Sequence, residues 1–264
     1  MTDQQQRSQA RRARHMMWPV LPGVVALLAW QFGSGTVVPA VYVSTPLDVA
    51  GRLVQVVASG EIIPDLTTTL VELVLGFVFG SIGGCVIGYL LGRSSFAARM
   101  FEPYIMAAYG IPMITIAPLF IIWFGIGIWS KVTIATIMVF FIVFFNVFMG
   151  VRNVDVELVK VARALGADQA QLTRHVYLRA TMPYIFMGLR AGVPYGVIGV
   201  IVGEFISAFR GLGLYMNKAS TTFDPAGVFA GIIILLAFIL VVKFLIGIAE
   251  KRVLRWHASL RDSH

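Results

Sequence analysis

Charged side chains are scarce in this 264-residue sequence: Asp, Glu, Lys and Arg together make up 13% of it. That is about half the share usual in soluble domains. Apolar residues make up 58%, and the mean hydropathy is +0.83. Because a soluble domain holds roughly 45–50% apolar residues, a water-soluble enzyme is not expected. Most of the chain is predicted to lie in lipid.

Residues that carry chemistry are also few. The single cysteine, Cys85, lies in an apolar run, which excludes a disulfide framework and indicates a small packing residue. HExxH, GxSxG and clustered Cys/His patterns are absent, as is any Gly-Lys pair that could form a GxxxxGK[ST] phosphate loop. The chain is therefore predicted to be no enzyme and to bind no metal or cofactor. If ATP drives its activity, another protein must bind the ATP.

Long apolar runs dominate what is present. A membrane-spanning helix needs about 20 residues, so the sequence predicts an all-α integral membrane protein with six spans. The runs cover residues 18–32, 66–92, 104–127, 132–150, 184–208 and 226–248. The predicted organisation is a basic tail at 1–17, a six-span domain at 18–248 that includes a polar loop at 151–183, and a tail at 249–264.

The formal charge is +8, and the positions of its Lys and Arg residues indicate how the chain is oriented in the membrane. Sixteen Lys and Arg residues fall on the side that holds both tails and the 151–183 loop, and four fall on the opposite side. By the positive-inside rule, both termini and this loop are predicted to be cytoplasmic. No basic face gathers these residues, so nucleic acid is not an expected partner.

One predicted span contains regularly spaced glycines, and another contains several prolines. Five glycines at a spacing of four predict one helix face that another helix approaches closely, as tight packing or as a mobile gate; they are Gly76, Gly80, Gly84, Gly88 and Gly92. Pro103, Pro112 and Pro118 predict kinks in the span at 104–127, which fit a transport path or simple bends equally well.

Ionisable residues within the spans are Glu72, Glu204 and Lys243. Because an isolated charge in lipid is costly, each calls for a functional hypothesis. Glu72 and Lys243 lie near span ends, where they are predicted to reach water. Glu204, Asn146 and Tyr195 are the candidate residues for a substrate path. Solvation of Glu204 and helix–helix hydrogen bonding by the other two are the simpler alternatives.

Two polar segments carry helix signals. Ser44-Thr45-Pro46 predicts a capped amphipathic helix with Pro46 at its first position. In the long loop, the sequence predicts a helix over Val151–Leu165, a break at Gly166, and a second helix from a capping box at Asp168 and Gln171 to Arg179. Pro183 is then expected to open the fifth span.

Several motifs resemble the permease subunits of ATP-binding-cassette (ABC) importers. The loop motifs are Val161-Ala162-Arg163-Ala164-Leu165-Gly166, Val176-Tyr177-Leu178 and Thr181-Met182-Pro183. Further matches to the subgroup for nitrate, taurine, aliphatic sulfonates and thiamine-precursor pyrimidines are Ser44-Thr45-Pro46, Gly60-Glu61-Ile62, Gly203-Glu204 and Gly211-Leu212-Gly213. Lys160 and Arg179 depart from that family's loop pattern, and the family often has Arg where Glu72 stands.

The resemblance implies a type I importer-like fold in the bacterial cytoplasmic membrane. It also implies a homodimer that works with two ATPase subunits, which bind ATP and Mg, and with an extracytoplasmic solute-binding protein. Residues Ala162, Arg163, Ala164, Leu165, Gly166 and Ala167 would form the coupling helix that docks on the ATPase. The solute would be a sulfonate, taurine, nitrate or a pyrimidine or other aromatic compound. The alternatives are an ion-coupled carrier or channel without ATPase subunits, and a membrane-embedded enzyme, for which no site is visible.

Overall fold

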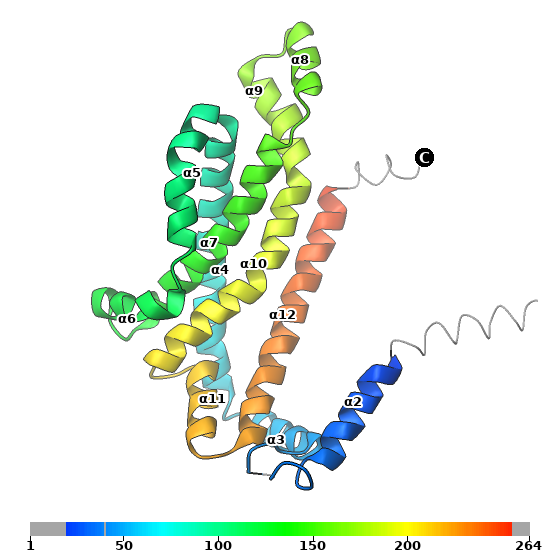
Figure 1. Ribbon diagram of the computed structural model, residues 1–264, viewed down its shortest axis with the longest axis vertical. Helices are drawn as coiled ribbons and strands as arrows, with labels where there is room; N and C mark the ends of the chain where they lie inside the picture. The colour runs from blue at the N-terminus through cyan, green and yellow to red at the C-terminus, as the bar shows by residue number, and fades with distance from the viewer. Residues whose placement is uncertain (1–19, 40, 255–264) are drawn as a thin grey trace, which may run out of the picture. The chain divides into compact units, whose positions relative to one another are not determined.

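The computed structural model describes residues 20–39 and 41–254, and every regular element in this part of the chain is a helix (Figure 1). The all-α prediction is therefore confirmed. The described residues form two compact units, one up to Ile62 with Tyr215–Ile232, the other comprising Ile63–Leu214 and the chain from Ile233. The predicted tail at 1–17 and residues 255–264 lie outside the described residues.

The first unit begins with α2 (Val20–Gly33) and the amphipathic α3 (Pro46–Ala58). The predicted cap of α3 is confirmed: the Thr45 hydroxyl accepts a hydrogen bond from the Asp48 amide, the Asp48 carboxylate accepts one from the Thr45 amide, and Pro46 is the first helical residue. The Trp30 indole of α2 donates to the Ser44 carbonyl at 2.9 Å, which holds α2 to the start of α3.

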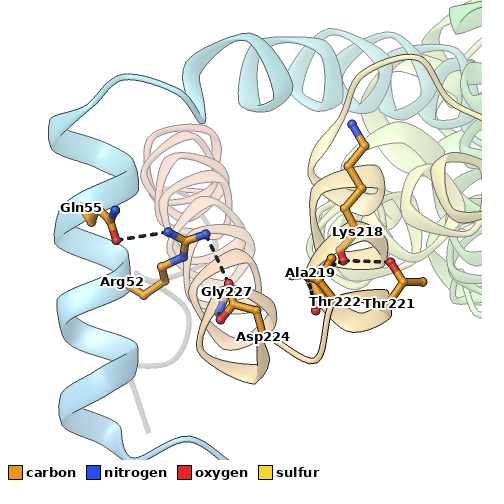
Figure 2. A network of polar contacts seen from close by, with 8 residues as sticks. All are labelled: Arg52, Gln55, Lys218, Ala219, Thr221, Thr222, Asp224 and Gly227. Carbon is orange, nitrogen blue, oxygen red and sulfur yellow. Dashed lines mark hydrogen bonds and ion pairs between the residues drawn. The ribbon is translucent and has the colours of Figure 1, made fainter. Parts of the chain in front are cut away.

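An ion pair joins α3 to the turn between α11 (Leu212–Thr221) and α12 (Pro225–Val253), as Figure 2 shows. The Arg52 guanidinium lies 3.2 Å from Asp224 and also donates to the Gln55 side chain at 3.1 Å. The other carboxylate oxygen of Asp224 accepts the Gly227 amide at 2.9 Å. Asp224 therefore caps the start of α12 and anchors Arg52 at the same time.

Replacing Asp224 with alanine is expected to lower the free energy of unfolding by about 1–2 kcal/mol, since both the cap and the ion pair are lost. Asp224→Asn keeps an oxygen for the Gly227 amide and should lose less. Unfolding of the purified protein in mixed micelles measures both values. An Asn variant as unstable as the Ala variant would show that the ion pair, and not the cap, matters here.

The core of the second unit is α7 (Ile128–Arg152), which packs against both α4 (Ile63–Arg93) and α10 (Leu178–Ile206) (Figure 1). In its most apolar stretch 56% of α7 is buried, against 6% for α12. The predicted glycine face of α4 lies against α7. A Cβ atom at Gly76, Gly80 or Gly84 would lie 2.6–2.8 Å from an α7 atom. Tight packing is thus confirmed as the use of this face.

A second glycine face, on α10, also meets α7. A Cβ atom at Gly199 would lie 2.7 Å from the Ala135 Cα, and one at Gly203 would lie 2.8 Å from the Lys131 Cγ. Glycines at Gly188, Gly192 and Gly196 continue the same face. Close backbone approach of both α4 and α10 to α7 increases the packing contacts that hold helices together in lipid.

The third predicted span is not one helix. The structure has α5 (Ser95–Tyr109) and α6 (Met113–Phe124), bent by 92° at the break between them. The prediction of kinks in the span at 104–127 is confirmed. The chain breaks at Gly110-Ile111-Pro112, because Pro112 has no amide hydrogen and disfavours helical backbone at the residue before it. Pro103 and Pro118 lie within the two helices.

The described residues contain four helices long and apolar enough to cross a membrane: α4, α7, the helical run Gln169–Ile206 and α12. They contain five if the bent pair α5 and α6 counts as one span. The described helix in the first predicted span, α2, has 14 residues, which is about 21 Å of a ~30 Å hydrocarbon layer. Six complete spans are therefore not present in this part of the chain. The helices α4, α7 and α12 extend beyond the predicted apolar runs at both ends, and α10 extends beyond its run at its N-terminal end only.

Candidate functional site

The predicted helix-turn-helix in the polar loop is present, with shifted bounds. The helix α7 ends at Arg152, residues 153–155 break it, and α8 (Val156–Ala164) starts from Asp155, whose carboxylate accepts the Glu157 amide at 2.8 Å. The predicted single helix over Val151–Leu165 is thus wrong. The sequence reasoning missed Asp155 as a helix cap, although an Asp directly before an apolar-periodic run is the usual signal.

Gly166 makes the turn that ends α8. Its φ of +84° lies in the left-handed region that favours glycine. The Gly166 amide donates to the Arg163 carbonyl at 2.9 Å and the Ala167 amide to the Ala162 carbonyl at 3.0 Å. This pair of bonds is the Schellman helix end, so the predicted break at Gly166 is confirmed.

The second helix of the loop runs without interruption into a membrane span. The predicted capping box is confirmed, with the Gln171 amide 2.7 Å from Asp168 and the Asp168 amide 2.9 Å from the Gln171 side chain. The helical run then continues as α9 (Gln169–Gln171), the π-helical turn η1 (Leu172–Tyr177) and α10. Pro183 is predicted to open the fifth span, but it lies inside α10, so no helix begins at this residue.

The loop has a buried apolar cluster and an exposed leucine at its turn. Val154, Val159 and Leu172 form a buried cluster beneath it. The Arg93 guanidinium at the end of α4 lies 3.6 Å from the Tyr177 ring centre and ties the loop to the spans. Leu165, at the turn, is 83% exposed. An ordered protrusion with an exposed apolar tip has the form of a docking surface. The structure thus gathers the six candidate coupling residues, Ala162, Arg163, Ala164, Leu165, Gly166 and Ala167, on one turn.

The three candidate path residues do not form one site. Asn146 is half-buried on α7, donates to the Ile142 carbonyl of its own helix at 2.8 Å, and faces Gly188 of α10. Glu204 lies 16 positions further along α10, about 24 Å away at the helical rise. Tyr195, between them in sequence, is 37% exposed. Their role in a solute path stays a prediction.

Glu204 and Glu72 meet in a buried cluster at one end of α4, α7 and α10. Their exposed fractions are 0% and 2%, so the prediction that Glu72 reaches water and the alternative that Glu204 is simply solvated are both wrong. The two carboxyl groups lie within hydrogen-bonding reach of each other. Lys131, 1% exposed, acts electrostatically on both and donates to the Ile126 and Gly127 carbonyls. Lys243 is exposed on α12, and its access to water stays a prediction.

The same cluster holds the chain where it leaves α10. Three consecutive amides of Gly211, Leu212 and Gly213 donate to side chains of α4 and α10, which satisfies the unpaired donors at the start of α11. The acceptors are Asp65 at 2.9 Å, the Thr69 hydroxyl at 2.8 Å and Glu204 at 2.5 Å. Gly211 has a φ of +138°, and a Cβ there would lie 2.2 Å from a Glu204 carboxylate oxygen. The Gly-Leu-Gly motif is thus required by close approach to Glu204.

Sequence reasoning missed Asp65, Thr69 and Lys131 as members of this cluster. A signal for two of them was present: Asp65, Thr69 and Glu72 recur at the spacing of one helix face in an apolar helix. Nothing in the local sequence of Lys131 indicates which carboxyl groups it approaches.

Comparison with known proteins finds one matching family model and several similar transport proteins. The model of the family described as binding-protein-dependent transport system inner membrane component matches residues 76–255. The riboflavin transport system permease protein RibX of Chloroflexus aurantiacus is 33% identical, over 94% of this chain and 95% of its own. The putative aliphatic sulfonates transport permease protein SsuC of Bacillus subtilis is 30% identical, over 91% and 87%. The formylaminopyrimidine transport permease protein ThiX of Halalkalibacterium halodurans is 28% identical, over 85% and 90%.

Solved structures share the fold. The MetNI methionine ABC transporter in an inward-facing conformation matches with a TM-score of 0.60 and 20% identity, over 71% of this chain and 92% of that one. An amino acid ABC transporter crystal structure matches with a TM-score of 0.58 and 21% identity, over 76% and 98%.

Proposed function

Because this chain belongs to the inner-membrane components of binding-protein-dependent transport systems, and is thus an ABC importer permease, we propose that two copies of it form one translocation path. The family works with ATPase subunits and a soluble binding protein. The exposed apolar side chains of α12 are left for lipid or a second copy to cover. Two ATPase subunits would bind ATP and Mg, and this chain would contribute no catalytic group.

The coupling surface is residues Ala162–Ala167. The observation that carries this proposal is the ordered helix-turn-helix with its exposed Leu165 tip and the Gly166 turn. When the ATPase dimer closes on ATP, movement of its docking groove would be transmitted through η1, which is continuous with α10. The ATPase must bind the loop with different affinities in the inward-facing and outward-facing states, since equal affinity for both would leave their populations unchanged.

Replacing Gly166 with leucine is expected to release the ATPase and to lower ATP-driven uptake at least tenfold, because a side chain at positive φ distorts the docking turn. Co-purification of the permease with its ATPase, followed by uptake in proteoliposomes, measures both effects. Gly125→Leu is the matched control, since Gly125 also has positive φ (+76°) and open space around it but lies outside the loop. Normal uptake by a well-expressed Gly166→Leu complex would contradict the proposal, as would equal ATPase release in both variants.

We further propose six spans, with α2 in the first and the bent pair α5 and α6 as the third. Both termini and the α8–α9 loop would face the cytoplasm. The excess of sixteen Lys and Arg residues over four on the opposite side supports this orientation. The chain would then comprise the tail at 1–17, the six-span domain at 18–248 and the tail at 249–264.

The solute would be a small organic compound or anion delivered by the binding protein, of the kinds that the relatives carry. Their names cover a flavin, a formylaminopyrimidine and aliphatic sulfonates. Uptake of these three solutes by the complete complex with its binding protein identifies the class. The ion-coupled carrier gains no support from these comparisons, because the relatives are permeases of binding-protein-dependent systems.

A further inference from the structure

Two carboxyl groups and one ammonium group are buried together within the spans. Glu72, Glu204 and Lys131 are each at most 2% exposed. If all three were ionised, the cluster would carry one net negative charge away from water. An uncompensated charge in such a place costs several kcal/mol. One extra proton makes the cluster neutral.

The hydrogen bonds decide which carboxyl group can be ionised. The Thr69 hydroxyl accepts the Leu212 amide, so its own proton is free for Glu204, 2.6 Å away. The other oxygen of Glu204 accepts the Gly213 amide. Both oxygens of Glu204 therefore face donors, as expected of an ionised carboxylate and not of a carboxylic acid.

Glu72 has the opposite environment. Among the described residues, no donor reaches its Oε2 atom, which is fully buried. A carboxylate oxygen there would lack any hydrogen bond, whereas a protonated Glu72 has an acceptor within reach in Glu204. A buried, unpartnered oxygen beside a fully satisfied carboxylate distinguishes this cluster from a mere group of acidic residues.

We propose that Glu72 is a proton-binding site: at neutral pH it holds one proton, which it donates in a hydrogen bond to ionised Glu204. The charged groups facing the pair are Lys131 from α7 and, at the partly exposed edge of α4, Asp65, which is bonded to the Gly211 amide. The proton keeps Glu204 in place, and Glu204 in turn holds the start of α11. This proposal does not depend on the solute or on the coupling role of the loop.

Infrared spectroscopy of the full chain in lipid nanodiscs at neutral pH tests it. The wild type should show the C=O stretch of a buried, protonated carboxylic acid, with the small downshift in D₂O that exchange produces. Glu72→Gln should remove this band, and Glu61→Gln, at an exposed glutamate, should keep it. Lys131→Met should raise its intensity about twofold, because neutrality then requires a second proton.

Thermal unfolding supplies a second measurement. Glu72→Gln can donate from its amide to Glu204 and should unfold near the wild-type temperature, whereas Glu72→Ala and Glu204→Gln should unfold at lower temperatures. A wild type without the band at neutral pH overturns the proposal. So does a band that persists in Glu72→Gln, or a Gln variant as unstable as the Ala variant at position 72.

Discussion

Replacing Gly80 with alanine is expected to lower the free energy of unfolding by about 3 kcal/mol, since one methyl group would force α4 away from α7. A Cβ atom at Gly80 would lie 2.6 Å from the Thr136 carbonyl oxygen and 2.8 Å from the Val139 Cβ. Neither neighbour can move aside, because the first is helix backbone and the second is completely buried. Unfolding in mixed micelles measures the loss.

Gly83 provides the matched control for this prediction. It lies on the same helix, within one turn of Gly80, but a Cβ there would meet only the Phe140 ring, at 3.4 Å. Gly83→Ala should therefore be neutral or stabilising, since alanine favours helix over glycine by about 1 kcal/mol. Equal losses at both positions would show that the close approach of α4 to α7 is not what makes Gly80 necessary.

Gly211→Ala is expected to lower the free energy of unfolding by about 3–5 kcal/mol and to make the α10–α11 connection more mobile. Left-handed backbone costs a residue with a side chain roughly 1–2 kcal/mol. The remaining loss arises because the new Cβ would lie 2.2 Å from the Glu204 carboxylate and displace it from Thr69 and Gly213. Proteolysis at the α10–α11 connection, together with unfolding in mixed micelles, measures both effects.

Backbone strain and displacement of Glu204 can be separated. Gly125 also has a positive φ (+76°, against +138° at Gly211), and no atom lies within 4 Å of the position its Cβ would take, so Gly125→Ala should lose only the strain energy. Combining Gly211→Ala with Glu204→Ala should cost less than the sum of the two single variants, because the collision is then relieved. Strict additivity, or a loss at Gly125 equal to that at Gly211, would contradict this account of the Gly-Leu-Gly motif.

Local features of the sequence were sufficient for much of the fold. The apolar runs identify α4, α7, α10 and α12 to within six residues at each end, because lipid admits only long apolar helices. Thr45 and Gly166 mark a helix start and a helix end through bonds that span at most five residues. The helix at 151–165 was misjudged, since a short break at residues 153–155 leaves little trace in an apolar pattern.

The sequence by itself determined the membrane class, the glycine face of α4 and the exposed helix-turn-helix. Each depends on composition or on spacing within one helix turn or two. Only the tertiary structure decided what Glu72 and Glu204 do. Thr69 and Glu204 are bonded across 135 positions of the chain, and Lys131 lies on a third helix. A sequence shows that a buried carboxyl group would be costly, but only the fold shows which donors offset that cost.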